Sequence, residues 1–304
     1  MEHDYQIIDE RFRQLILNPP TVHVEQLWRG ARWTEGPAYF PAHRALVWSD
    51  IPNNRMLRWS ETGHVEVFRA PSNFANGHTV DRQGRLVSCE HLTRRVTRTE
   101  HDGTISVLAD SYQGKRLNSP NDVVVKSDGT VWFTDPPYGI LGDYEGARAE
   151  QEQPACHVFR FDPRNGALRA VLDSFAKPNG LAFSLDEKIL YVANTARSHD
   201  PQGPAQICQF RVDDGGNLSG GEVFADCTNG LFDGFRLDEQ GNIWSSAADG
   251  VHCYTPDGTL LGKVLIPEVV ANVCFGGRVR DRLFITATTS VYAVYLGVRG
   301  AKTF

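Results

Sequence analysis

The chain has 304 residues, a formal net charge of −6 and 41% hydrophobic residues. Its acidic balance, without a basic stripe, argues against a nucleic-acid-binding protein, because such proteins gather Lys and Arg on one face. No apolar run reaches the ~20 residues that a membrane span requires, and the amino terminus lacks the basic-then-apolar order of a signal peptide. We therefore expect a soluble protein that binds neither nucleic acid nor membrane.

The cysteines lie at irregular spacings, without a CxxC pair, and several fall inside strand-like runs. They are Cys89, Cys156, Cys208, Cys227, Cys253 and Cys274. Disulfide frameworks are typical of small secreted domains rather than of a chain of this length. We expect buried free thiols and a cytoplasmic location.

Residues 1–30 form a leader that shares no pattern with the rest of the chain. We expect it to pack on the outside of the fold or to complete the last structural repeat. No Gly/Ser/Pro linker or charge run divides residues 31–304, so we predict a single domain there.

From residue 35 onward, the chain repeats a strand–turn–strand pattern six times. Each unit opens on Asn, Asp or Glu, and the first apolar residue of its second strand follows 10 or 11 positions later. The units are residues 35–50, 76–90, 121–135, 179–194, 233–247 and 272–287. Successive second strands begin 40 to 59 residues apart, a period typical of propeller blades with four short strands each. We predict an all-β fold, a six-bladed β-propeller.

The middle of each unit predicts a tight hairpin turn, because Gly and Asp gather there, as at Asp81 and Asp238. Each opening residue therefore lies at the end away from the turn, where the second strand returns. The longest connections also leave from that end, including the twenty residues 136–155. Loops of that length on a rigid scaffold are usually functional or disordered. We expect 136–155 to border an entrance and to influence which substrates enter.

The six opening side chains all carry hard oxygen donors. They are Glu35, Asn76, Asn121, Asn179, Asp233 and Asn272. Asn-Gly and Asp-Gly also occur in turns, but here the hairpin turn lies five or more residues further on. A closed ring would bring these oxygens to the central channel, where two carboxylates and four amides suit a divalent cation. Calcium is favoured because it accepts mixed, irregular oxygen ligands; magnesium, manganese or zinc are expected substitutes in vitro.

Five further positions are candidate substrate contacts at the same end of the ring: Asn76, His78, Asn118, Asp135 and Tyr138. His78 stands two residues after Asn76, so both side chains point the same way in a strand. It either packs through hydrogen bonds or orients a ligand. Asp135 ends a second strand, where it either caps the following turn or binds substrate hydroxyls.

Six longer motifs occur in order between about residues 25 and 300. They read EGP at Glu35, SDIPNNRMLRW at Ser49, SPNDVV at Ser119, WFTDPPYG at Trp132, KPNGLAFS at Lys177 and FDGFRLDEQGNIW at Phe232. This set resembles the gluconolactonase branch of the senescence marker protein (regucalcin)/gluconolactonase/luciferin-regenerating enzyme family. The resemblance implies a six-bladed β-propeller with one divalent ion, usually calcium, in its central channel. It also implies hydrolysis of sugar lactones.

The resemblance carries the family's metal ligands onto Glu35, Asn121, Asn179 and Asp233, four of the six opening residues. The aspartate that is often assigned as the general base matches Asp233. The chain departs from the animal members at Ser119, where those proteins have a substrate-binding arginine. The sugar contacts of that branch are therefore not transferred.

The sequence thus predicts a calcium-dependent hydrolase that opens sugar lactones. The ion would polarise the lactone carbonyl for attack by water, and Asp233 would accept the proton of that water. Two other classes stay open. One is a metal-dependent phosphotriesterase that uses the same ion, and the other is a non-enzymatic propeller that binds a partner around a structural ion.

Overall fold

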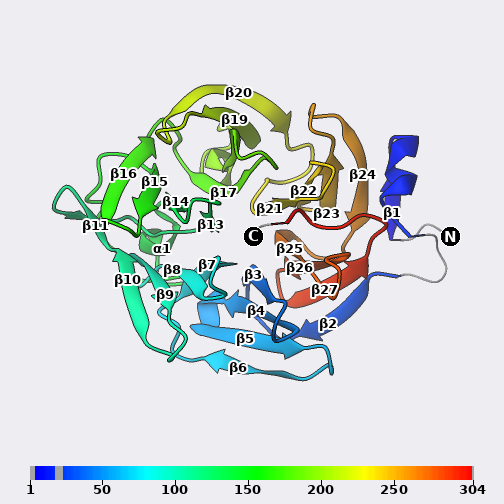
Figure 1. Ribbon diagram of the computed structural model, residues 1–304, viewed down its shortest axis with the longest axis horizontal. Coiled ribbons are helices and arrows are strands. Elements are labelled where there is room, and N and C mark those ends of the chain that lie inside the picture. The colour runs from blue at the N-terminus through cyan, green and yellow to red at the C-terminus, as the bar shows by residue number, and fades with distance from the viewer. Residues whose placement is uncertain (1–3, 18–22, 303–304) are drawn as a thin grey trace.

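A computed structural model describes residues 4–17 and 23–302 of the chain. Six antiparallel sheets stand around a central axis like the blades of a propeller, with the innermost strand of each sheet at the axis (Figure 1). This confirms the predicted fold class. Among the described residues, no helix is long and apolar enough to cross a membrane.

The blades follow one another along the chain. In the first three, from the inner strand outward, the strands are β3 (Thr34–Phe40), β4 (Ala45–Asp50), β5 (Arg55–Ser60) and β6 (Val65–Arg69); β7 (Ala75–Val80), β8 (Leu86–Glu90), β9 (Arg95–Thr99) and β10 (Ile105–Ala109); and β13 (Val123–Val125), β14 (Val131–Asp135), β15 (His157–Asp162) and β16 (Ala167–Leu172). In the next two they are β17 (Pro178–Phe183), β18 (Ile189–Asn194), β19 (Gln206–Val212) and β20 (Leu218–Asp226); and β21 (Phe235–Leu237), β22 (Ile243–Ala247), β23 (Gly250–Tyr254) and β24 (Leu260–Leu265).

The sixth blade joins the two ends of the chain. Its inner strands are β25 (Val270–Gly276), β26 (Arg282–Ala287) and β27 (Ser290–Tyr295), and its outer strand is β2 (Glu25–Arg29), paired with β27. An earlier strand, β1 (Tyr5–Ile7), pairs with β24 on the outside of the fifth blade. The leader therefore has two structural roles. One of its strands packs on the ring and the other closes it.

The six predicted units are the two innermost strands of the six blades. The second strands β4, β8, β14, β18, β22 and β26 end at the last residues of the predicted units. The predicted turns are also present and are held by their acidic residues: Asp81 Oδ1 accepts the main-chain N–H of Arg85 at 2.9 Å, and Asp238 Oδ1 accepts that of Asn242 at 2.9 Å.

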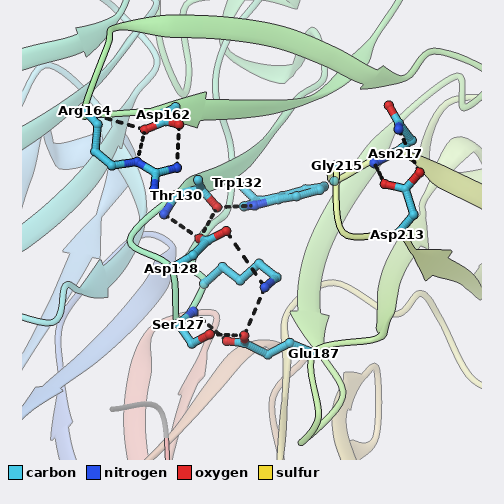
Figure 2. Close-up of polar contacts among 12 residues, drawn as sticks. Ser127, Asp128, Thr130, Trp132, Asp162, Arg164, Glu187, Asp213, Gly215 and Asn217 are labelled. Atoms are coloured by element: carbon cyan, nitrogen blue, oxygen red, sulfur yellow. Dashed lines mark hydrogen bonds and ion pairs between the residues drawn. The ribbon is translucent and has the colours of Figure 1, made fainter.

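The turn end of the third blade shows how neighbouring blades are tied together (Figure 2). Asp128 Oδ1 accepts the main-chain N–H of Thr130, whose hydroxyl accepts the indole N–H of Trp132 at 2.9 Å. Glu187, from the turn of the fourth blade, accepts the main-chain N–H of Ser127 at 2.6 Å. Hydrogen bonds thus hold the hairpin turn of the third blade and join it to the turn of the fourth blade.

Apolar side chains fill the space between adjacent blades. Trp48, Trp132 and Trp244 occupy the second strands of three blades and have no exposed surface. Trp132, for example, packs with Leu181 and Leu190 of the next blade. All six cysteines are buried and free, as the sequence predicted.

The inner strands approach one another so closely at the axis that there is no room for a side chain after several opening residues. Gly77 donates its N–H to the main-chain oxygen of Asn121 at 2.8 Å, and a Cβ on Gly77 would lie 2.3 Å from that oxygen. Gly180 donates to the oxygen of Asp233 at 3.1 Å, and its Cβ would lie 2.0 Å away. Gly36 packs in the same way on the main-chain oxygen of Asn76, whereas Gly234 packs on the side chain of Asn272. The Asn-Gly and Asp-Gly pairs therefore serve contact between blades rather than turns.

The opening residues also interrupt the regular pairing of their strands. One extra residue is accommodated in β3, β7, β17 and β25 beside the opening residue. In β7, for example, Asn76 and Gly77 together lie opposite Cys89 of β8. Such a bulge turns a side chain out of its normal strand direction. Here each bulge lies beside an opening residue, at the central axis of the ring.

We predict that Gly180→Ala lowers the stability of the ring. The added methyl would collide with the main-chain oxygen of Asp233, and overpacking of this kind costs about 1–3 kcal/mol or more. Chemical denaturation would measure the free energy of unfolding. Gly142→Ala is the control, because Gly142 has extended backbone and open space around its Cβ position. Equal stability of the two variants would contradict the close approach.

Candidate active site

A cavity of about 440 Å³ opens among the long loops, at the end of the ring away from the hairpin turns. Five of the six opening residues line it: Glu35, Asn76, Asn121, Asn179 and Asp233. The four predicted metal ligands and two of the predicted substrate contacts, Asn76 and Tyr138, therefore line one cavity, and the five opening residues among them come from five different blades. Apolar side chains such as Trp33 and Leu231 complete its wall.

Glu35 is held by two donors and has one free oxygen. Its Oε1 accepts the N–H of Gly36 at 2.8 Å and the amide Nδ2 of Asn272 at 2.6 Å. Asn272 is itself fixed, because its Oδ1 accepts the N–H of Val273 at 2.8 Å. Glu35 Oε2 is buried without a partner. The sixth opening residue, Asn272, therefore orients Glu35 and does not line the cavity.

The two carboxylates of the cavity are electrostatically strained without a cation. Burial raises the pKa of both Glu35 and Asp233, and repulsion from Glu35 and the nearby Asp122 raises the pKa of Asp233 further. A hydrogen bond from Asn179 acts in the opposite direction on Asp233. A bound cation would favour the charged form of both carboxylates and so relieve the strain.

The donor set fits a hard divalent cation. Among the four predicted ligands, Glu35 has a buried oxygen without a partner, Oε2. Within residues 4–17 and 23–302, no three His, Cys, Asp or Glu side chains are close enough to hold a metal together. An ion in this cavity would therefore need amide oxygens beside the two carboxylates, as calcium sites commonly use.

His78 does not reach the cavity. It is fully buried in β7, with Nε2 2.7 Å from Ser49 Oγ and Nδ1 2.8 Å from Ser88 Oγ. Burial lowers the pKa of His78 to about 3, which keeps the ring neutral. Of the two roles predicted for His78, the structure supports hydrogen-bonded packing.

Asp135 and Asn118 are also buried away from the cavity, where they hold a chain reversal together. Asp135 Oδ2 accepts the main-chain N–H of Asn118 at 2.7 Å, and the Asn118 side chain donates to the main-chain oxygens of Asp135 at 3.0 Å and Ala155 at 3.1 Å. Burial raises the pKa of Asp135 to about 7. Neither residue lines the cavity, which argues against the predicted substrate contacts, and the Asp135 carboxylate holds Asn118, before β13, rather than capping the turn that follows β14.

The long loop between β14 and β15 forms one wall of the cavity, as predicted from its length. It begins with a single helical turn, α1 (Tyr138–Leu141), and residues 138, 141, 142, 144 and 145 line the cavity. The Tyr138 hydroxyl lies 2.7 Å from Thr195 Oγ1 and 2.9 Å from Ser198 Oγ, which ties the loop to the fourth blade.

Ser119 anchors the start of the same loop through two hydrogen bonds. Its hydroxyl donates to the main-chain oxygen of Pro136 at 2.6 Å and accepts the N–H of Gly139 at 2.9 Å. Ser119 is fully buried. The residue that replaces the substrate-binding arginine of the animal proteins therefore has a structural task and does not contact the cavity.

Glu145 is a cavity residue that the sequence did not single out. Its partly buried carboxyl group lines the cavity, burial raises its pKa to about 7, and its charge raises the pKa of both Glu35 and Asp233. The segment 143–152 contains four acidic residues in irregular context, so no spacing marks this one. Thr195, Ser198 and His199 were missed for the same reason, because they belong to an irregular loop.

Comparison with known proteins agrees with this arrangement. Residues 33–289 match the pattern described as the SMP-30/Gluconolactonase/LRE-like region. The chain belongs to this family.

The gluconolactonase of Zymomonas mobilis is 32% identical to this chain over 89% of this chain and 80% of its own length. The pentonolactonase XacC of Haloferax volcanii is 32% identical over 84% of this chain and 81% of its own. A solved gluconolactonase from Xanthomonas campestris is 39% identical, with a TM-score of 0.90, and the match covers 96% of this chain and 94% of that one.

We predict that Asp135→Ala weakens folding but not substrate binding. Loss of the carboxylate leaves the buried N–H of Asn118 without an acceptor, which costs about 1–3 kcal/mol. Denaturation would measure the loss, and steady-state kinetics on the folded fraction should give an unchanged KM. A selective rise in KM with unchanged stability would return Asp135 to the substrate contacts.

Proposed function

We propose that this protein is a calcium-dependent hydrolase that opens sugar lactones. The observation that carries the proposal is the convergence of Glu35, Asn121, Asn179 and Asp233 on one cavity, with a buried carboxylate oxygen that has no protein partner. The names of the gluconolactonase and pentonolactonase relatives support lactones as the substrate class. The cavity volume of about 440 Å³ falls in the range of small-molecule sites.

In this proposal, Glu35, Asn121, Asn179 and Asp233 hold the ion, with Asn272 fixing Glu35 in place. When bound, the ion supplies Lewis acidity toward the lactone carbonyl oxygen. The four protein ligands carry a formal charge of −2, which balances a divalent cation. Calcium is our proposed ion because it tolerates a mixture of carboxylate and amide oxygens.

Asp233 is the proposed acceptor of the proton from the attacking water. It is more exposed than Glu35, which is only 4% exposed, so its carboxylate is better placed to meet a water in the cavity. A role as ligand alone is the alternative for Asp233. The loop supplies a further carboxyl group for substrate hydroxyls, because Glu145 lines the same cavity.

The proposal is tested with a panel of sugar lactones, aliphatic lactones and phosphotriesters. Each is assayed with EDTA and then with calcium, magnesium, manganese or zinc restored. We expect sugar lactone hydrolysis that EDTA abolishes and calcium restores best. Turnover of phosphotriesters alone would favour the phosphotriesterase class. No hydrolysis of any compound would favour a binding module with a structural ion.

A pair of variants separates charge from chemistry at the two carboxylates. Asp233→Asn and Glu35→Gln each remove one negative charge and keep one carbonyl oxygen, so weakened ion binding should affect both alike. If Asp233 is the base, Asp233→Asn should lower kcat by about 10²-fold or more. That loss should persist at saturating calcium, whereas Glu35→Gln should recover much of its activity.

The outcome is read from kcat as a function of calcium concentration. Equal recovery of the two variants at high calcium would reduce Asp233 to a ligand. The search for the base would then move to Glu145, the other carboxyl group that lines the cavity.

A further inference from the structure

His91 connects a cavity residue to the long loop. It directly follows β8 and has no exposed surface. Its Nε2 lies 3.1 Å from the amide Nδ2 of Asn76, and its Nδ1 lies 2.9 Å from the main-chain oxygen of Glu145. One imidazole therefore bridges the second blade and the loop between β14 and β15.

The chemistry of these two contacts determines how the imidazole is protonated. A carbonyl oxygen only accepts hydrogen bonds, so the proton must be on Nδ1 of His91. Burial lowers the pKa of His91 to about 4, and the ring is therefore neutral at physiological pH. A neutral ring with a proton on Nδ1 has a bare Nε2, which only accepts.

A bare Nε2 selects one orientation of the Asn76 amide. It accepts a hydrogen bond from the NH₂ group, whereas the amide oxygen would be repelled by its lone pair. Asn76 Oδ1 must then point away from His91, and it is indeed buried without a protein partner. Asn76 also lines the cavity.

We propose that His91 is a positioning residue that fixes the Asn76 amide, so that Asn76 Oδ1 is held on the side away from His91 as the hydrogen-bond acceptor for a substrate hydroxyl when the cavity is filled. This rests on the proposed lactone hydrolase function. The same contact makes the acceptor depend on the loop, because the proton of His91 is placed by the Glu145 carbonyl. Gly139 reinforces the fit, since a Cβ at that position would lie 2.5 Å from the His91 side chain.

The position of the loop between β14 and β15 therefore fixes the orientation of the Asn76 amide through His91. When the loop is seated, Glu145 places its carboxyl group at the cavity and its carbonyl on His91. When it is unseated, Nδ1 loses its acceptor and the imidazole is free to change tautomer. The Asn76 amide then loses its fixed orientation.

A double-mutant cycle tests the proposal. We expect His91→Leu and Asn76→Ala each to lower kcat/KM for a sugar lactone by about tenfold, the order of one lost hydrogen bond, mainly through KM. The double variant should be no worse than the poorer single variant, because both changes remove the same acceptor. His91→Gln should recover part of the loss, since its amide keeps one donor and one acceptor.

His252→Leu is the matched control. His252 is another fully buried histidine, bound to Asp249 at 2.7 Å in the fifth blade and away from the cavity. Its effect on kcat/KM, if any, should add to that of Asn76→Ala. Additive losses for His91→Leu and Asn76→Ala would overturn the proposal.

A second readout does not depend on activity. Long-range ¹H–¹⁵N spectra distinguish the histidine tautomers, and the signal missing in His91→Leu identifies His91. We expect the tautomer with the proton on Nδ1, and the opposite tautomer would overturn the inference. A wild-type protein that shows this tautomer but hydrolyses no lactone would remove the proposed function and leave the His91–Asn76 geometry standing.

Discussion

The close approach of the inner strands at the axis is the constraint on which the site depends. Where a glycine follows the opening residue, its N–H or its bare Cα rests against the next blade, as Gly77 does on Asn121 and Gly180 on Asp233. Contacts this short fix the main chain of one opening residue relative to that of the next. Side chains from five blades can therefore converge on one cavity, although each is attached to only a short strand.

Two sets of residues build the site at the central axis: those that line the cavity and those that orient them. Glu35 is buried and Asp233 is half-buried, and the repulsion between these two carboxylates favours binding of a cation. Beneath them, Asn272 and His91 use their own hydrogen bonds to orient Glu35 and Asn76. Such supporting hydrogen bonds fix the orientation of the side-chain oxygens near the axis.

Much of this could be predicted from the sequence, because the blade repeat gives equivalent residues equivalent places. The opening residues and the ends of the second strands follow directly from that period. The repeat does not show which side of a strand faces the axis, so His78 could not be distinguished from a ligand until its contacts with Ser49 and Ser88 were seen. Glu145 lies in an irregular loop without a period, and its position depends on packing against His91 from another blade.

The outer strand of the last blade, β2, precedes every blade in the chain, while its partner β27 comes near the end. During synthesis on the ribosome, the segment that seals the circle therefore emerges early and must wait for nearly the whole chain before it can pair. Five sheets have time to form while the sixth is incomplete. The last step of assembly is then the meeting of two distant segments, and until it occurs β27 presents an open edge to which another chain could add.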